Sequence, residues 1–149
     1  MRFFKIFFIL VTSGALFSCH HNTLFQAVSS SLSNIHFNNQ IIENDSVNEL
    51  DIENVYNGGG VGVGDFNNDG LQDIYFAGNL VACKLYLNKG DFKFQDITEE
   101  AKVNGETRWC RGVAVVDINN DGWQDMYVCA TLNKSAKIKN QSVVCKSGG

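Results

Sequence analysis

The chain has 149 residues, of which 44% are hydrophobic and 19% charged, and its formal net charge is −4 at pH 7. This length suits one domain of ordinary size, and the acidic balance argues against nucleic-acid binding, which needs a basic surface. Much of the acidity lies in two short loops, so the net charge by itself says little about other partners.

The first eighteen residues have the pattern of an export signal. Arg2 and Lys5 form a short positive region, and residues 3–17 are an almost uninterrupted apolar run. An apolar run of about fifteen residues is too short for a typical spanning helix and has the proportions of a signal-peptide core. We therefore predict that residues 1–18 form a signal peptide that is removed.

The apolar run ends at Cys19, and residues 16–19 resemble the lipobox of bacterial lipoproteins. By that resemblance, Cys19 becomes the lipid-modified N-terminus, and residues 19–24 form a lipidated tether to the membrane. Several acyl chains on one residue give stable anchoring. His20, in place of an aspartate, favours the outer membrane or cell surface. The alternative is an ordinary secretory signal in which Cys19 is incidental.

Downstream of the tether, the residue pattern changes from polar to strand-like. Residues 25–56 are rich in Asn and Ser, and only Ile35–Phe37 alternates as a short strand would. From Tyr56 onward, alternating apolar residues and turn residues predict β-structure, with a single helical turn at Thr98–Lys102. The expected strands lie around 61–63, 74–77, 85–87, 92–97, 113–115 and 126–129.

Part of the chain is duplicated at an offset of 52 residues. The residues that recur are Gly60, Val61, Val63, Asp65, Asn67, Asn68, Asp69, Gly70, Gln72, Asp73 and Tyr75. A second echo, of residues 25–29 in 94–98, brackets the unit. Self-similarity at a fixed period with short strands is typical of propeller blades. We predict an all-β fold: two blade-like antiparallel β repeats of an incomplete β-propeller, with calcium-loop hairpins, over 25–91 (with an N-terminal insertion) and 92–149.

Two repeats are too few for a closed propeller, which usually needs about four to eight blades. The second repeat lacks an obvious counterpart of the strand at 85–87, because residues 141–149 break the repeated pattern. We interpret the chain as a C-terminally truncated or frameshifted part of a longer repeat protein. The alternative is a two-repeat protein that forms oligomers.

The two copies of one acidic loop carry the chemistry. Residues 65–73 and 117–125 both read D-x-N-x-D-G-x-x-D, which places three carboxylates and an amide at loop positions 1, 3, 5 and 9. Hard oxygen donors at this density suit Ca²⁺, and without a cation the carboxylates would repel one another. The sequence therefore predicts two calcium sites. The alternative is a metal-free turn, since Asn, Asp and Gly favour tight turns by themselves.

An EF-hand is a poor explanation of these loops. Its loop opens in the same way but ends with a bidentate Glu at position 12, where this chain has Phe76 and Val128. The expected flanks are also strands and not helices.

A D-x-N-x-D-G-x-x-D loop that leads into a strand resembles the calcium loops of FG-GAP and VCBS repeats, the blades of integrin-alpha-like β-propellers. The likeness covers roughly residues 57–140. It lacks the Phe-Gly and Gly-Ala-Pro halves that name the FG-GAP repeat, and the closer likeness is to large bacterial surface lipoproteins with VCBS-type repeats. The resemblance implies that four side chains and one backbone carbonyl bind calcium in each loop. The ligands of the first loop would be Asp65, Asn67, Asp69, Leu71 and Asp73, and those of the second Asp117, Asn119, Asp121, Trp123 and Asp125. Leu71 and Trp123 would contribute the backbone carbonyls.

Glycine at loop position 6 fits this scheme. Gly70 and Gly122 are expected to adopt positive φ, which allows the sharp turn around an ion.

The remaining candidates are weaker. Cys83, Cys110, Cys129 and Cys145 could form disulfides in an oxidising compartment, although we expect Cys129, in a strand, to be a buried free thiol. Trp109 is expected to pack between blades, with a binding surface as the alternative. No Ser or Cys has a neighbouring base that would suggest a nucleophile, so no catalytic residue is predicted.

From these observations we interpret the chain as a non-enzymatic calcium-binding β-repeat lipoprotein of the bacterial envelope. Calcium would be structural, the membrane would be reached through lipidated Cys19, and an unknown protein or glycan would be the ligand in surface adhesion. The alternative is a fragment of a propeller enzyme, or of an enzyme-associated domain, that acts on polysaccharide. A third possibility is a fragment that does not fold.

Overall fold

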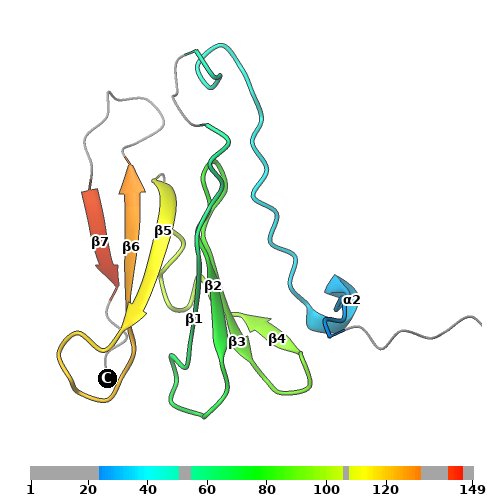
Figure 1. Cartoon of the computed structure of the whole chain (residues 1–149), viewed down its shortest axis with the longest axis vertical. Helices are drawn as coiled ribbons and strands as arrows, with labels where there is room; N and C mark the ends of the chain where they lie inside the picture. Colours follow the sequence, from blue (N-terminus) through cyan, green and yellow to red (C-terminus); the bar gives the residue numbers. More distant parts are fainter. Residues whose placement is uncertain (1–23, 51–54, 106–107, 132–140, 146–149) are drawn as a thin grey trace, which may run out of the picture.

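The computed structural model describes residues 24–50, 55–105, 108–131 and 141–145. This part of the chain is nearly all β: apart from a four-residue helix, α2 (Ser30–Ser33), its regular elements are strands (Figure 1). The predicted all-β class is confirmed. The predicted signal peptide, residues 1–18, and Cys19 lie outside the described residues. Among the residues that the structure describes, no helix is long and apolar enough to cross a membrane.

The first sheet has four antiparallel strands in the order β1 (Val61–Gly64), β2 (Asp73–Phe76), β3 (Lys84–Asn88) and β4 (Phe94–Asp96). In the pairing of β3 with β4, Tyr86 lies opposite Asp96 and Asn88 opposite Phe94. We had expected the second repeat to begin at residue 92, but β4 belongs to the first sheet. The first sheet therefore ends at Asp96, and the turn at residues 98–102 follows it.

The second sheet has three antiparallel strands in the order β5 (Trp109–Val116), β6 (Asp125–Thr131) and β7 (Gln141–Cys145). We expected residues 141–149 to break the repeat, but 141–145 form the strand that corresponds to β3. Phe76 pairs with Lys84, eight residues on, whereas its counterpart Val128 pairs with Val143, fifteen residues on. Because the connection between β6 and β7 is longer than the one between β2 and β3, β7 does not lie 52 residues after β3. Lengthening a connection costs little free energy, so the strand can still form.

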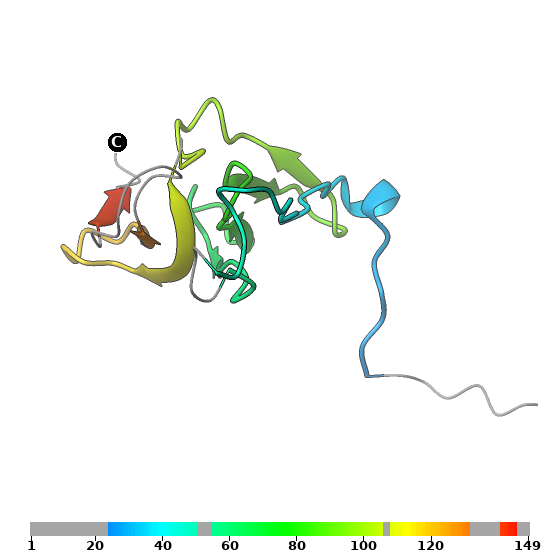
Figure 2. The same ribbon diagram turned by 90° about the horizontal axis from the view of Figure 1, so that it is seen from above.

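The two sheets pack face to face through one apolar core, and Figure 2 shows them side by side. Tyr75, on β2, and Ala77, directly after it, point into this core, whereas Ile74 and Phe76 lie on the opposite face of β2. On β6, however, the core residues include Met126, the repeat counterpart of Ile74. The sheets therefore use opposite faces for their contact, as successive members of a stack do.

This stacking leaves one face of the second sheet open. Val116, on β5, is 50% exposed, and Cys129, on β6, is also exposed. Our expectation of a buried Cys129 is wrong, because strand alternation places it opposite Val128, on the face turned away from the core.

The N-terminal segment, residues 24–50, covers the outer face of the first sheet. It runs along the face of the first sheet that is turned away from the second sheet (Figure 1). The Phe37 ring stacks on Phe76, with 4.9 Å between the ring centroids. Asn34 Nδ2 donates to the Phe94 carbonyl at 3.2 Å. The predicted strand at Ile35–Phe37 is wrong, because side-chain contacts and not a strand ladder hold this segment: the His36 N–H donates to the Tyr86 hydroxyl.

Trp109 packs where the N-terminal segment reaches the second repeat. Its side chain is 4% exposed and forms a small apolar cluster with Val47 and Val55, bordered by Ile41 and Leu80. Trp109 is therefore a packing residue, as expected, but it packs mainly against residues that precede the first sheet and not between the two sheets.

Close approach of β1 to β5 depends on glycine. A Cβ atom on Gly60 would lie 2.3 Å from the Arg111 carbonyl oxygen, and one on Gly62 would lie 2.6 Å from Val113 Cγ1. Distances this short require atoms to move, and at Gly60 the obstacle is backbone. Glycine at these positions therefore sets the distance between the sheets.

Replacing Gly60 by Ala is expected to destabilise the protein by about 2 kcal/mol, because the new methyl group forces the sheets apart. The matched control is Gly112→Ala in the second repeat, where the nearest atom would be Cys129 Cβ at an ordinary 3.7 Å. Urea unfolding of both variants checks this. Equal losses in the two variants would show that the space beside β5 does not limit residue 60.

Candidate metal centre

The two acidic loops lie at the same end of the two sheets, where they connect β1 to β2 and β5 to β6 (Figure 1). They also touch each other. The Asp65 N–H donates to Gln124 Oε1 at 2.7 Å, and Asn68 Nδ2 donates to the Gly122 carbonyl at 3.5 Å. Position 8 of the second loop thus binds position 1 of the first, a role for glutamine that the sequence analysis missed.

The position 1 carboxylates are held alike in both loops. Asp65 Oδ1 accepts from the Asp69 N–H at 3.1 Å, and Oδ2 accepts from the Gly70 N–H at 2.8 Å. In the second loop, Asp117 accepts from the N–H groups of residues 121 and 122 at the same two distances. These bonds turn both carboxylates inward, under the tip of their loop.

Positions 3 and 5 join this group through direct side-chain contact. In the first loop, Asn67 Nδ2 donates to Asp69 Oδ2 at 2.9 Å, and in the second Asn119 Nδ2 donates to Asp121 Oδ2 at 2.7 Å. The position 5 carboxylate also accepts from the N–H of position 7 in each loop, at 2.8 and 2.9 Å. Each loop therefore gathers two carboxylates and one amide within a single turn.

The backbone of both loops turns at two positions. Gly70 and Gly122 have φ of 85° and 87°, which confirms the positive φ expected at position 6. Asn68 and Asn120, at position 4, also have positive φ, at 56° and 59°. We did not predict these, although asparagine is enriched in the left-handed region and the Asn-Asn pair in both copies was a usable signal.

Position 9 differs from positions 1, 3 and 5 because it is buried. Asp73 is 0% exposed; its Oδ2 accepts from the Phe66 N–H at 3.0 Å and its Oδ1 from the Asn88 N–H at 2.8 Å. Burial raises the pKa of the Asp73 carboxyl, the two N–H groups oppose this rise, and the charges of Asp69 and Asp65 add to it. Asp73 thus ties the loop to β3.

The second loop repeats this arrangement in its described part. Asp125 is 2% exposed, and its Oδ2 accepts from the Ile118 N–H at 3.1 Å. The sequence analysis treated all four polar positions as equivalent ligands and missed the structural role of the last one.

The donors that the structure brings together suit a hard cation. Carboxylate and amide oxygens at positions 1, 3 and 5 are the donors that Ca²⁺ prefers, and a carboxylate oxygen that accepts one N–H keeps a further lone pair. Leu71 and Trp123, at position 7, are each 37% exposed. Among the described residues, no three Asp, Glu, His or Cys side chains form a ready metal cage, which is consistent with position 9 being directed into the sheet.

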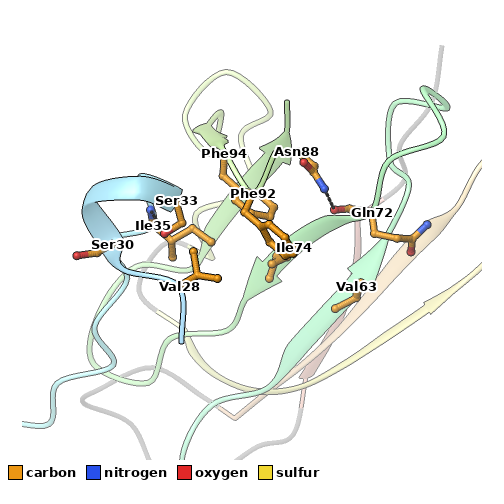
Figure 3. Close-up of a pocket in the computed structure, with 10 residues that line it drawn as sticks. All are labelled: Val28, Ser30, Ser33, Ile35, Val63, Gln72, Ile74, Asn88, Phe92 and Phe94. Carbon is orange, nitrogen blue, oxygen red and sulfur yellow. Dashed lines mark hydrogen bonds between the residues drawn. The ribbon is translucent and has the colours of Figure 1, made fainter. Parts of the chain in front are cut away.

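A separate hollow lies between helix α2 and the outer face of the first sheet (Figure 3). Its volume is about 490 Å³, and on one side Asn88 Nδ2 donates to the Gln72 carbonyl at 3.0 Å. The lining residues carry no acid, base or thiol, so the hollow offers space for an apolar group and nothing for proton transfer. They are Val28, Ser30, Ser33, Ile35, Val63, Gln72, Ile74, Asn88, Phe92 and Phe94.

Comparison with known proteins supports the resemblance drawn from the loops. Residues 65–128 match the FG-GAP-like repeat. That stretch runs from position 1 of the first loop into β6, so it contains both loops. It covers 64 of the 149 residues.

A relative is known at moderate similarity. Over 74 residues the chain is 38% identical to cartilage acidic protein 1 of Xenopus tropicalis, an alignment that covers 49% of this chain. The chain spans 11% of that protein's length. No solved structure matches the chain.

Proposed function

We propose that this chain supplies two calcium-stabilised blades of a β-propeller-type domain, and that calcium acts there as a structural ion. The observation that carries the proposal is that the same two backbone hydrogen bonds hold the position 1 carboxylate in two loops 52 residues apart. The hydrogen bonds of a turn alone do not require two carboxylates side by side, at positions 1 and 5, in both copies. A divalent cation gives a reason for this arrangement, because it neutralises charges that otherwise repel.

The loops are placed where a structural ion would act on both sheets. The first loop joins β1 to β2, and its position 1 N–H is bound by Gln124 of the second loop. An ion that orders one loop therefore also supports the contact between repeats. Binding energy that is gained only in the folded state adds to folding stability.

The propeller part of the proposal rests on the way in which the sheets stack. One face of the first sheet packs on the opposite face of the second, so the same contact can be repeated. The exposed outer face of the second sheet, with Val116 and Cys129, is where a following blade would pack. Blades of a longer chain or of a second copy could occupy it. A head-to-tail contact of this kind closes into a ring when the rotation between units permits.

The cellular part of the proposal rests on the sequence. We propose that the chain is exported, lipid-anchored through Cys19 at the outer membrane or cell surface, and non-enzymatic. A complete propeller there would present a face to a protein or glycan. The hollow beside α2 does not favour the polysaccharide-enzyme alternative, because its lining carries no titratable side chain.

Direct calcium binding tests the proposal. In equilibrium dialysis with radioactive calcium, the folded chain is expected to bind two Ca²⁺ ions, with a Kd of about 10⁻⁴–10⁻³ M, the range of extracellular calcium modules. Mg²⁺ at the same concentration is expected to compete poorly, because it demands strict octahedral geometry and loses its water reluctantly. A folded chain that binds no calcium in this range would contradict the proposal.

A further inference from the structure

Two buried thiols from different repeats meet in the core between the sheets. Cys83 immediately precedes β3, and Cys110 lies on β5. The two residues are 1% and 2% exposed, respectively. The Cys110 thiol donates a hydrogen bond to the Cys83 sulfur. Gly105 lies against both sulfurs: a Cβ atom on this residue would be 2.7 Å from Cys83 Sγ and 3.1 Å from Cys110 Sγ. Because glycine has no Cβ atom, no side chain of residue 105 occupies the space beside the two sulfurs.

The backbone on both sides of this pair is held in place. The Gly78 N–H donates to Cys83 Sγ at 3.4 Å, and the Gly78 carbonyl accepts from the Cys110 N–H at 3.0 Å. The Cys83 N–H donates to the Asn104 carbonyl at 2.8 Å. The two sulfurs are therefore neighbours because the first sheet, the turn after β4 and β5 converge there, and not through a chance rotamer.

We propose that Cys83 and Cys110 form a disulfide, which links the first blade covalently to the first strand of the second. The described alternative partner, Cys129, is exposed on the outer face of the second sheet, away from the core in which the pair lies. A metal site is a poorer explanation of the pair. Soft metals such as Zn²⁺ take four ligands, and no third Asp, Glu, His or Cys joins the two thiols among the described residues.

The oxidant is a low-molecular-weight disulfide. The thiolate of Cys83 attacks one of its sulfurs and releases one small thiol, leaving a mixed disulfide on residue 83. Cys110 then loses its proton, attacks the Cys83 sulfur and releases the second small thiol. The two protein thiols lose two protons and two electrons, and the oxidant becomes two thiols.

In the reduced folded chain, the hydrogen bond from Cys110 lowers the pKa of the Cys83 thiol to about 6. Burial hides both sulfurs in the folded chain, which places the reaction during folding, before the sheets close, and shields the finished bond from reductants. The proposal is independent of calcium binding.

The test is oxidative refolding of the full chain. Reduced, denatured protein is refolded with a mixture of reduced and oxidised glutathione, or with excess dithiothreitol, and free thiols are then alkylated. After proteolysis without reductant, we expect a peptide pair joined through Cys83 and Cys110 in the first sample only. The disulfide would close the chain between residues 83 and 110 into a loop, and a loop of this length predicts that the oxidised protein melts roughly 10 °C above the reduced protein.

Variants separate this bond from other pairings. Cys83→Ser and Cys110→Ser are each expected to abolish the cross-link and the difference in melting temperature between the two samples. Cys129→Ser, the control, is expected to change neither. The proposal is overturned if the wild-type peptide map joins Cys83 or Cys110 to Cys19, Cys129 or Cys145, or if both residues stay reduced. The peptide map needs no variant, so it decides the matter even if a serine variant does not fold.

Discussion

Replacing both Asp69 and Asp121 by Ala is expected to remove most of the stabilisation that calcium gives this protein. Both carboxylates are exposed and lie at loop position 5, beside the position 3 amide. At a calcium concentration of about one hundred times Kd, each occupied site adds about 2.7 kcal/mol to the free energy of unfolding. Two sites therefore add about 5 kcal/mol, most of which the double variant should lose.

The measurement is a thermal melt of the wild type and the variants in EGTA and across a calcium titration. In EGTA the double variant should melt close to the wild type, since surface substitutions usually change stability by about 0.5 kcal/mol or less. With calcium, the wild-type melting temperature should rise by about 10 °C or more, and the variant's should barely change. Glu100→Ala, which removes an exposed acid outside the loops, is the control. A double variant that keeps the full calcium response would contradict the ligand assignment.

The single variants add a further check. The position 5 carboxylate makes the same hydrogen bond in each loop, so the two sites are expected to contribute equally. Asp69→Ala and Asp121→Ala should therefore each lose about half of the rise in melting temperature that calcium gives the wild type. A loss confined to one of them would show that only that loop binds the ion.

The features that sequence predicted are those with a short-range cause. Strand alternation located β1 to β6, and the repeated D-x-N-x-D-G-x-x-D loop predicted the hairpins and the positive φ at Gly70 and Gly122. In each case the signal lies within a few residues, because it depends on the two-residue period of a strand or on the conformation that glycine permits.

The features that sequence missed depend on residues distant along the chain. Whether Asp73 faces solvent or the sheet is decided by Asn88, fifteen residues later, whose N–H needs an acceptor. Cys129 is exposed because the repeats stack through opposite faces, which no single strand pattern reveals. β7 was missed because a longer connection moved it away from the 52-residue offset. Tertiary context, and not weak local propensity, explains each of these differences.

The distinction between position 5 and position 9 leads to a second large effect. Asp73→Ala is expected to destabilise the protein by about 3 kcal/mol even in EGTA, because it leaves the Phe66 and Asn88 N–H groups buried without an acceptor. An orphaned buried donor costs about 1–3 kcal/mol. Part of the loss is offset, since the carboxylate that is removed was itself buried and had a raised pKa.

Urea unfolding in EGTA measures this difference, with Asp69→Ala as the matched control from the same loop. Asp73→Asn should lie between the wild type and Asp73→Ala, because its amide keeps one acceptor oxygen for two donors. If Asp73→Ala unfolds like the wild type in EGTA and loses only its response to calcium, the residue is a ligand and the tie to β3 carries no energy. If it is destabilised in EGTA as expected, the loop is anchored to the sheet before any ion arrives. Calcium would then order only the exposed half of the loop.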